Sequence, residues 1–503
     1  MLPRVLAVLP AAAAAVLLTA NPRAQAPVAT LIRNASLVDG TGAPPRRADV
    51  RIAGDRIAAV GELTATADDR TVDAAGLVLA PGFIDTHSHH DRGLPSARDA
   101  LAAASQGITT IVVGQDGGSA FPIASFLADL DAQPAAVNVA SYVGHGTLRR
   151  QAMAADFKRK ATDDEVRRME ELLRGEMAAG ALGLSTGLEY DPGIYSNPVE
   201  VIRLAKVAAS RGGRYISHLR SEDRTLWAAV EEAIAIGREA KLPVQISHLK
   251  LAMRSLWGQT GRLVGMLDRA RAGGVQVTAD VYPYTYWQST ATVLFPARNF
   301  NDRAEAEFVL KELVAPEGLL FGSFPPHPAY AGKTLAEIAG IRKTAPAETL
   351  LHLIGEAESA GTSAGIVATS MDEADVAGIM RWPHANICSD GMLGGAHPRG
   401  YGSFTRVLGR YVRERGILRL PEAIRKMTSL SAANVGIQQR GLIAPGRYAD
   451  LVLFNPETVI DRASTGEPHA VSGGIAMVWV NGEVVFRDGA TTRRYPGRVL
   501  RRP

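Results

Sequence analysis

Short apolar runs that end in polar residues recur through the middle of the chain, and they constrain its fold more than any other feature. Amphipathic stretches of helical character separate several of these runs. The clearest runs are GITTIVVG, VNVASYVG, ALGLSTG, GRYISHL, VQISHLK and VQVTADVYPY. Repeated β-α units of this length predict a parallel sheet. With about eight units, the α/β fold class that fits best is a closed (β/α)8 TIM-like barrel.

Two of the intervening segments carry clear helix signals. Residues 163–181 and 224–242 are both amphipathic, and the second follows Glu222-Asp223 and ends before Pro243. Acidic residues at the start and a proline after the end are the boundaries expected of a helix. These segments therefore alternate with the strands as a barrel requires.

The later part of the middle region leaves two points open. GIVATSM and ANICSDG both read as strands, so the identity of the last barrel strand is ambiguous. Residues 293–355 break the rhythm with helical segments and a Pro-rich stretch. We interpret them as an insertion after the seventh strand, either a lid over the barrel or a loop without function.

The two ends of the chain resemble each other and differ from the middle. Residues 27–80 and 441–503 contain short alternating or β-branched runs broken by Gly, Asp and Asn, a pattern typical of strands and turns. Asn481-Gly482 stands between two apolar runs, which is a strong hairpin signal. We therefore expect one small β-sandwich domain built from both termini, around a barrel that spans residues 81–440.

The leader, residues 1–26, has the features of a secretory signal peptide. Arg4 supplies a positive charge, residues 6–18 are apolar, and the sequence up to Ala26 fits the small-x-small cleavage rule. The apolar stretch is short for a membrane anchor, and no later segment is long and apolar enough to cross a bilayer. We expect cleavage after about Ala26, a secreted or periplasmic protein, and no membrane attachment after cleavage.

Composition and charge exclude several other functions. The formal net charge is only +4 and no basic run has interleaved aromatic residues, which argues against a nucleic-acid partner. The single cysteine, Cys388, rules out an intrachain disulfide and a cysteine-rich zinc site. The oligomeric state stays open, although barrels of this kind often form homo-oligomers.

Histidines stand at the ends of several predicted strands. His87 and His89 form a His-x-His pair, and residues two apart on a strand point to the same side. His218 and His248 each end an Ile-Ser-His run in consecutive units. Because the carboxyl ends of barrel strands meet at one mouth, we expect the four imidazoles to form a metal site. Any one of them alone could equally be a hydrogen-bonded core histidine.

Asp390 follows the last predicted strand, in Ile-Cys-Ser-Asp-Gly. A bound metal lowers the pKa of its water towards about 7 and polarises a scissile carbonyl. A carboxylate at this position could take the proton from that water and pass it to a leaving nitrogen. The alternative is an ordinary turn residue before Gly391.

Taken in order, the motifs resemble those of the amidohydrolase superfamily. PGFIDTHSHHD, the two SHL segments, SDGML and MTSLSAANVGIQQRGLIAPGRYADLVLFNP carry this resemblance. More narrowly, GITTIVVG, GHGTLRR, LSTGLEYDPG, SHLRSE, SHLK, DVYPYT and HPRGYGSF follow the order seen in N-acyl-D-amino-acid deacylases (D-aminoacylases), over about residues 30–490. The resemblance implies a zinc-dependent enzyme that hydrolyses N-acyl-D-amino acids, or related N-acyl or dipeptide substrates.

The resemblance also implies a metal site with one or two Zn²⁺ ions. His218 and His248 would hold a tightly bound zinc, while His87 and His89 would hold a second, weaker position. D-aminoacylases typically have Gly-Asn-Cys-Gly after the second strand, and the cysteine binds zinc. This chain has Gly-Gln-Asp-Gly there, so we expect Asp116 to be a ligand in place of the cysteine.

Further residues match positions with other roles in that family. Asp390 would be the general acid and base, Lys250 and Arg399 would bind the α-carboxylate of the substrate, and Tyr284 would line the same pocket. From the residues themselves, His145 at the third strand end could contact the substrate or an oxyanion, or make a structural hydrogen bond. Glu189, after the fourth strand, is the carboxylate that competes with Asp116, as a ligand or as a substrate contact.

Two other functions remain as alternatives. A cyclic-amide hydrolase of the hydantoinase or dihydroorotase kind would be expected to carry a lysine at the end of the fourth strand, which this chain lacks. A degenerate barrel that only binds a ligand is disfavoured because the four strand-end histidines and Asp390 are all present.

Overall fold

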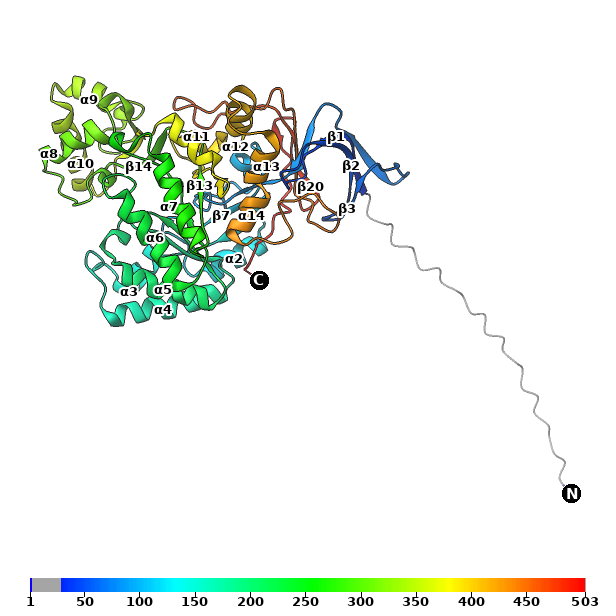
Figure 1. The fold of residues 1–503 in the computed structure, drawn as a ribbon, viewed down its shortest axis with the longest axis horizontal. Helices are drawn as coiled ribbons and strands as arrows, with labels where there is room; N and C mark the ends of the chain where they lie inside the picture. Colours follow the sequence, from blue (N-terminus) through cyan, green and yellow to red (C-terminus); the bar gives the residue numbers. More distant parts are fainter. Residues whose placement is uncertain (2–28, 503) are drawn as a thin grey trace.

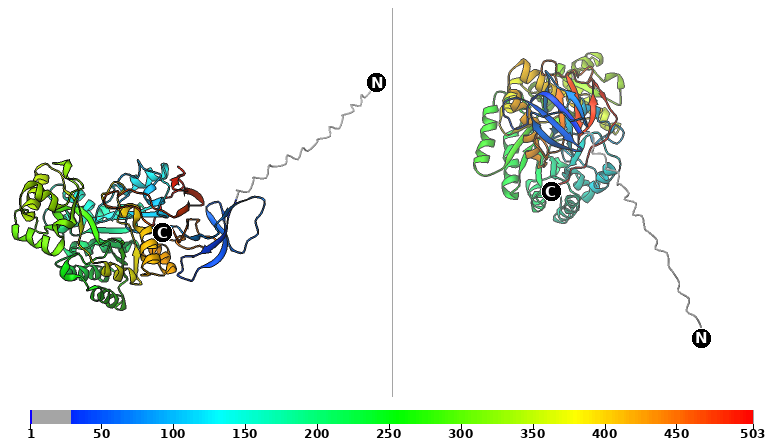
Figure 2. Two further views of the ribbon diagram at one scale, coloured as in Figure 1. Left: turned by 90° about the horizontal axis from the view of Figure 1, so that it is seen from above. Right: turned by 90° about the vertical axis from the view of Figure 1, so that its right-hand side faces the viewer.

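The computed structural model describes Met1 and residues 29–502, and its elements lie in three regions along the long axis of the molecule (Figures 1 and 2). An inserted subdomain with α8, α9 and α10 lies at one end, a barrel in the middle, and a β-domain with β1, β2 and β3 at the other end. Apart from Met1, the predicted signal peptide falls outside the described residues. Within the described part of the chain, no helix has the length and hydropathy needed to span a bilayer.

Eight strand positions form the barrel, and every strand pair within it is parallel. The strands are β6 (Phe83–Asp85), β7 (Ile108–Val113), β8 (Asn138–Ser141) with β9 (Val143–Gly144), β10 (Gly183–Gly187), β11 (Arg214–His218), β12 (Val244–Ile246), β13 (Val277–Val281) and β17 (Ala385–Ile387). The third position is split, because Tyr142 interrupts it between β8 and β9. A bridge from Ser88 to Gly391 joins the first and last positions, and the amide of Leu182 donates to the carbonyl of Ser141 across the split. The predicted (β/α)8 barrel is confirmed.

Hydrogen bonding settles which late segment is the eighth strand. ANICSDG supplies β17, which pairs with β13 in the barrel. GIVATSM supplies β16 (Gly365–Thr369), which pairs instead with β14 (Tyr286–Thr290) and β15 (Leu319–Ser323) outside the barrel. Both runs are apolar enough to be buried strands, so only their partners distinguish them.

Helices surround the barrel, and the predicted segments are among them. α4 begins at a capping box in which Thr162 and Glu165 satisfy each other's backbone amides. The helices are α1 (Leu101–Ala104), α2 (Ile123–Ala132), α3 (His145–Met153), α4 (Asp163–Ala178), α5 (Pro198–Ser210), α6 (Leu226–Ala240), α7 (Thr260–Ala272), α11 (Glu373–Arg381), α12 (Arg399–Arg406), α13 (Leu420–Met427) and α14 (Ser429–Val435), with short helical turns η1 (Gly193–Tyr195), η2 (Arg254–Leu256) and η7 (Val407–Glu414).

The insertion after the seventh strand is a small subdomain that is longer than the predicted residues 293–355. It begins at β14 and ends at β16, because these two strands pair antiparallel and bring both ends of the insertion together. Between them lie η3 (Ala291–Leu294), α8 (Arg303–Phe308), η4 (Val309–Leu313), η5 (Pro316–Gly318), β15, η6 (Pro328–Tyr330), α9 (Leu335–Arg342) and α10 (Pro346–Ser359).

The β-domain draws its strands from both ends of the chain. Its nine strands form one continuous sheet, in the order β21-β20-β19-β18-β5-β1-β2-β3 with β4 beside β1. They are β1 (Ala29–Leu37), β2 (Arg46–Ala53), β3 (Arg56–Gly61), β4 (Asp69–Asp73), β5 (Val78–Pro81), β18 (Leu451–Phe454), β19 (Ile475–Val480), β20 (Glu483–Arg487) and β21 (Ala490–Thr491). The two ends meet where β5 pairs antiparallel with β18, and Ile32, Leu79, Leu451 and Trp479 belong to a core separate from that of the barrel.

Candidate active site

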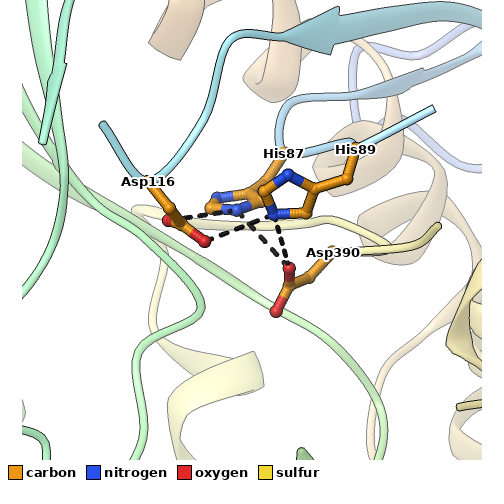
Figure 3. Close-up of side chains that lie close together, drawn as sticks. All are labelled: His87, His89, Asp116 and Asp390. Carbon is orange, nitrogen blue, oxygen red and sulfur yellow. Dashed lines mark ion pairs between the residues drawn. The ribbon is translucent and has the colours of Figure 1, made fainter. Parts of the chain in front are cut away.

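Four side chains from three strand ends converge at the mouth of the barrel (Figure 3). His87 and His89 follow β6, Asp116 follows β7 and Asp390 follows β17. The Nε2 atoms of the two histidines lie 3.4 and 3.2 Å from oxygens of Asp116, and 3.5 and 3.3 Å from Oδ1 of Asp390. Imidazole nitrogens and carboxylate oxygens so placed can share one cation.

A second group of potential ligands shares Asp116 with the first. The Nδ1 atom of His218 is 3.0 Å from Nε2 of His248, which is itself 3.6 Å from Oδ1 of Asp116. All three ligand atoms of this group lie within 4.8 Å of one another. The site therefore offers two adjacent metal positions with Asp116 common to both.

Three of these residues have an unusual backbone conformation. The φ angles of Asp116, His248 and Asp390 are 53°, 34° and 50°, in the left-handed region that side chains other than glycine rarely adopt. Hydrogen bonds hold two of them there: the amide of His248 donates to Asp280 at 2.5 Å, and the amide of Asp390 donates to the carbonyl of His87 at 2.8 Å. Strained backbone of this kind is typical of sites that must aim a side chain in one direction.

The donor set carries the charge that suits a divalent cation. Burial raises the pKa of a carboxyl group, but the neighbouring histidines outweigh it and hold the pKa of Asp116 well below its usual range. Burial likewise opposes the ionisation of Asp390, yet the Arg399 guanidinium and the histidines lower its pKa. Oδ1 of Asp116 and both ring nitrogens of His87 are buried and have no hydrogen-bond partner among the described residues. Buried polar atoms need a partner, and the residues present fit a metal ion.

Two glutamates hold the far sides of the histidine pair. Nε2 of His218 is 2.9 Å from Glu189, and Nδ1 of His248 is 3.0 Å from Glu222. Glu222 also binds Nζ of Lys250 at 2.6 and 2.7 Å. Sequence analysis assigned no role to Glu222, because it stands four residues past the end of β11 in a loop; its place in the SHLRSE motif was the one available signal.

Beside His218, His248 and Asp390 lies a cavity between the barrel mouth and the insertion. Of the residues predicted to bind substrate, Lys250, Arg399 and Glu189 line this cavity, together with Asp390. Arg399 lies 2.6 Å from Oδ2 of Asp390 and packs over the ring of Tyr282.

Two predicted substrate contacts lie elsewhere and need correction. Tyr282, rather than Tyr284, lines the cavity, because the chain leaves the barrel after Val281 and the alternation of a strand no longer applies. The ring of Tyr284 is buried and packs edge-on against His397.

His145 is the second correction. It begins α3 and is fully buried, and its Nε2 atom is 2.8 Å from Glu200. Arg149 binds the same carboxylate from one turn further along the helix. Among the described residues that line the cavity His145 is absent, so the structural hydrogen bond is the alternative that the geometry supports.

Comparisons with known proteins agree with this site. The model of the amidohydrolase family matches residues 70–317 and 388–486. The chain is 40% identical to N-acyl-D-glutamate deacylase of Alcaligenes xylosoxydans xylosoxydans, covering 94% of this chain and 96% of that protein. It is 37% identical to D-aminoacylase (95% and 98% covered) and 38% identical to N-acyl-D-aspartate deacylase (93% and 94% covered), both from the same organism.

Solved structures give the same answer at the level of the fold. A crystal structure of D-aminoacylase matches with a TM-score of 0.85 and 36% identity, over 94% of this chain and 99% of that one. N-acyl-D-glutamate deacylase from Bordetella bronchiseptica, complexed with zinc and a phosphonate inhibitor, matches with a TM-score of 0.85 and 38% identity, over 94% of this chain and all of that one (100%). The expected family is confirmed: this chain belongs to the amidohydrolase family and, within it, to the N-acyl-D-amino-acid deacylases.

Proposed function

We propose that this protein is a zinc-dependent hydrolase that cleaves the amide bond of N-acyl-D-amino acids. The observation that carries the proposal is the pair of adjacent ligand groups that share Asp116, with Asp390 beside them. The positively charged side chains of Lys250 and Arg399 line the same cavity. The relatives named above as deacylases support it, and so does the solved relative complexed with zinc.

Asp116, His218 and His248 would hold the first zinc ion, and His87 and His89 would share Asp116 to hold a second. When bound, zinc acts as a Lewis acid on a carbonyl and lowers the pKa of a water towards about 7. Glu189 fits the role of a positioning residue better than that of a metal ligand in place of Asp116. It contacts Nε2 of His218, the nitrogen that faces away from His248. Glu189 and Glu222 therefore act as positioning residues, each fixing the orientation of one ligand imidazole.

Asp390 is placed to move the proton during amide cleavage. Its Oδ1 atom faces His87 and His89, while Oδ2 contacts Arg399. From there Asp390 takes the proton of the attacking water and gives it to the nitrogen that leaves. Arg399 keeps Asp390 ionised before it takes the proton, and its contact with Oδ2 holds the carboxyl group in place.

Lys250 and Arg399 would bind the α-carboxylate of the substrate. Both are buried at the wall of the cavity, and both already contact carboxylates, of Glu222 and Asp390 respectively. Charge-assisted hydrogen bonds to a substrate carboxylate fix the position of the neighbouring amide relative to Asp390.

The experiment that tests the proposal combines metal analysis with hydrolysis of matched enantiomers. The mature protein is purified, its zinc is measured by mass spectrometry, and free amino acid is quantified from N-acetyl-D- and N-acetyl-L-amino acids. We expect zinc to co-purify and only the D-series to be cleaved efficiently. Release from the L-series alone, or zinc-loaded protein that releases no amino acid from either series, would contradict the proposal.

A further inference from the structure

The cavity has two chemically different walls. The wall from the barrel is polar and contains His218, His248 and Asp390, whereas the wall from the insertion is largely apolar. We call its apolar part the apolar wall: Trp287 from β14, Val293 and Leu294 from η3, and Leu313 from η4. Gln288 and Ser289 from β14 also line the cavity and are polar. Ala252, in the loop after β12, adds to the apolar part of the lining. A substrate whose amide reaches Asp390 therefore has an apolar surface available on the side of the insertion.

The positively charged side chains that line the cavity already contact carboxylates of the protein. Among the described residues that line it, Lys250 and Arg399 are the only lysine or arginine, and they pair with Glu222 and Asp390. Glu189, Glu222, Asp223 and Asp390 are the acids of the same lining. Lys250 and Arg399 can receive one α-carboxylate, and no further lysine or arginine of the described lining is left to pair with a second carboxylate.

One further arginine, Arg298, lies near the cavity but does not line it. Arg298 follows the apolar residues of η3, but its guanidinium binds Asp191 at 3.1 Å and the carbonyls of Thr292 and Glu189 at 3.0 and 2.9 Å. It is not part of the described lining of the cavity. Its donors fasten the insertion to the loop after β10 and are not directed at a ligand.

We infer that the amino acid released from the substrate has an apolar side chain, not a carboxylate, and that Val293, Leu294 and Leu313 determine this preference. The inference rests on the proposed function and narrows it. Overall similarity does not decide the matter, because relatives named for D-glutamate, D-aspartate and D-amino acids in general are nearly equally identical to this chain. A side-chain carboxylate would lose its hydration against the apolar wall without gaining a cation, whereas an aliphatic side chain would be buried favourably.

The first test compares kcat/KM for N-acetyl-D-leucine and N-acetyl-D-methionine with that for N-acetyl-D-glutamate and N-acetyl-D-aspartate. We expect the apolar substrates to be preferred by at least about 100-fold, the scale on which an apolar pocket rejects a more polar side chain. Equal or greater kcat/KM for the acidic substrates would overturn the inference while leaving the proposed function intact. Failure to cleave any of the four would count against the proposed function itself.

If none of the four substrates is cleaved, the binding of free amino acids still tests the inference. Calorimetry on the zinc-loaded protein then compares D-leucine with D-glutamate. Tighter binding of D-leucine supports an apolar side-chain site, and tighter binding of D-glutamate refutes it.

A variant pair assigns the preference to the wall. Val293 is only half-buried, so Val293→Arg adds a cation to the apolar wall with little cost to folding. We expect the ratio of D-glutamate to D-leucine activity to rise at least about tenfold, which corresponds to one new charge pair. Ala304→Arg adds the same charge to the exposed surface of α8 in the same subdomain and should leave the ratio unchanged. Equal ratios in both variants would show that Val293 does not face the substrate side chain.

Discussion

At the scale of single residues, the site depends on a few side chains that are aimed by strained backbone. The strand-end histidines could be predicted from the sequence because a polar residue that ends a buried parallel strand must point into the barrel mouth. Tyr282 could not, because the strand ends at Val281 and the chain then turns towards the insertion. Only the family resemblance favoured Asp116 over Glu189, since their distances to the histidines depend on where the loops after β7 and β10 fold back.

The first residue-scale prediction concerns Asp116. Asp116→Ala should lose most of its zinc on dialysis, because this carboxylate contacts His87, His89 and His248 at once. Glu189→Gln, the matched comparison, should retain a metal site that is weakened about 10- to 100-fold, as expected when a residue only orients a ligand. Zinc content and competition with a chelator measure both. If Asp116→Ala keeps its full zinc content and Glu189→Gln loses its zinc, then Glu189 is the metal ligand and Asp116 is not.

The second concerns Asp390. Asp390→Asn should keep its zinc but lose about 100- to 10,000-fold in kcat, the usual contribution of a general acid and base. The amide cannot accept the proton, although it can still fill the same space beside Arg399. Steady-state kinetics at matched zinc content give the result, with Asp163→Asn on the exposed start of α4 as a control. A kcat close to that of the parent protein would remove Asp390 from the mechanism.

At the scale of elements, the pairing of strands determines assignments that the pattern of apolar residues in the sequence leaves open. The hairpin at Asn481-Gly482 was predictable because both residues adopt positive φ angles, 47° and 83°, that this dipeptide tolerates. The extent of the insertion was not, because only the pairing of residues 286–290 with β16 shows that they belong to the subdomain. The apolar side chains of η3 likewise gave no sign that they face a cavity.

A prediction at this scale tests how the C-terminal hairpin packs on the N-terminal strands. Gly482→Ala should lower the free energy of unfolding by well over 1 kcal/mol, roughly the cost of a left-handed alanine, because its Cβ atom would lie 2.0 Å from the carbonyl oxygen of Gly54. Gly489→Ala is the matched control: its φ angle is 84°, yet no atom lies within 4 Å of the added Cβ.

Denaturant unfolding of the two variants isolates the clash from the backbone strain that they share. A larger loss of stability in Gly482→Ala than in Gly489→Ala would show that the turn before β3 and the turn after β19 pack tightly together in solution. Equal losses of stability would contradict that packing.

At the scale of the whole molecule, the barrel stands between two regions with different tasks. The insertion supplies one wall of the cavity, while the β-domain, with strands from both termini, lies at the opposite end of the molecule (Figure 1). The alternation of strands and helices was sufficient to predict the barrel, since few other folds bury so many parallel strands. The sequence left open whether the insertion is a lid or a loop without function, and its residues in the lining of the cavity show that it forms a wall.

Export of the chain is a proposal at this scale. We propose that the leader is cleaved after about Ala26 and that the mature protein is secreted or periplasmic. The first described strand, β1, begins at Ala29, so the proposed cleavage would leave it whole. Intact-mass analysis of the protein recovered outside the cytoplasm should show the loss of residues 1–26. A full-length mass in the cytoplasmic fraction alone would contradict export.

The central claim is that zinc, held through Asp116 and the histidine pair, enables this site to hydrolyse N-acyl-D-amino acids. The most direct measurement removes the metal with a chelator, restores zinc stepwise, and records bound zinc together with hydrolysis of N-acetyl-D-leucine. The account predicts no hydrolysis without metal and a rise in proportion to the first zinc bound, with the L-enantiomer unreacted throughout. Hydrolysis that persists in the metal-free protein, or that does not follow zinc occupancy, would contradict it.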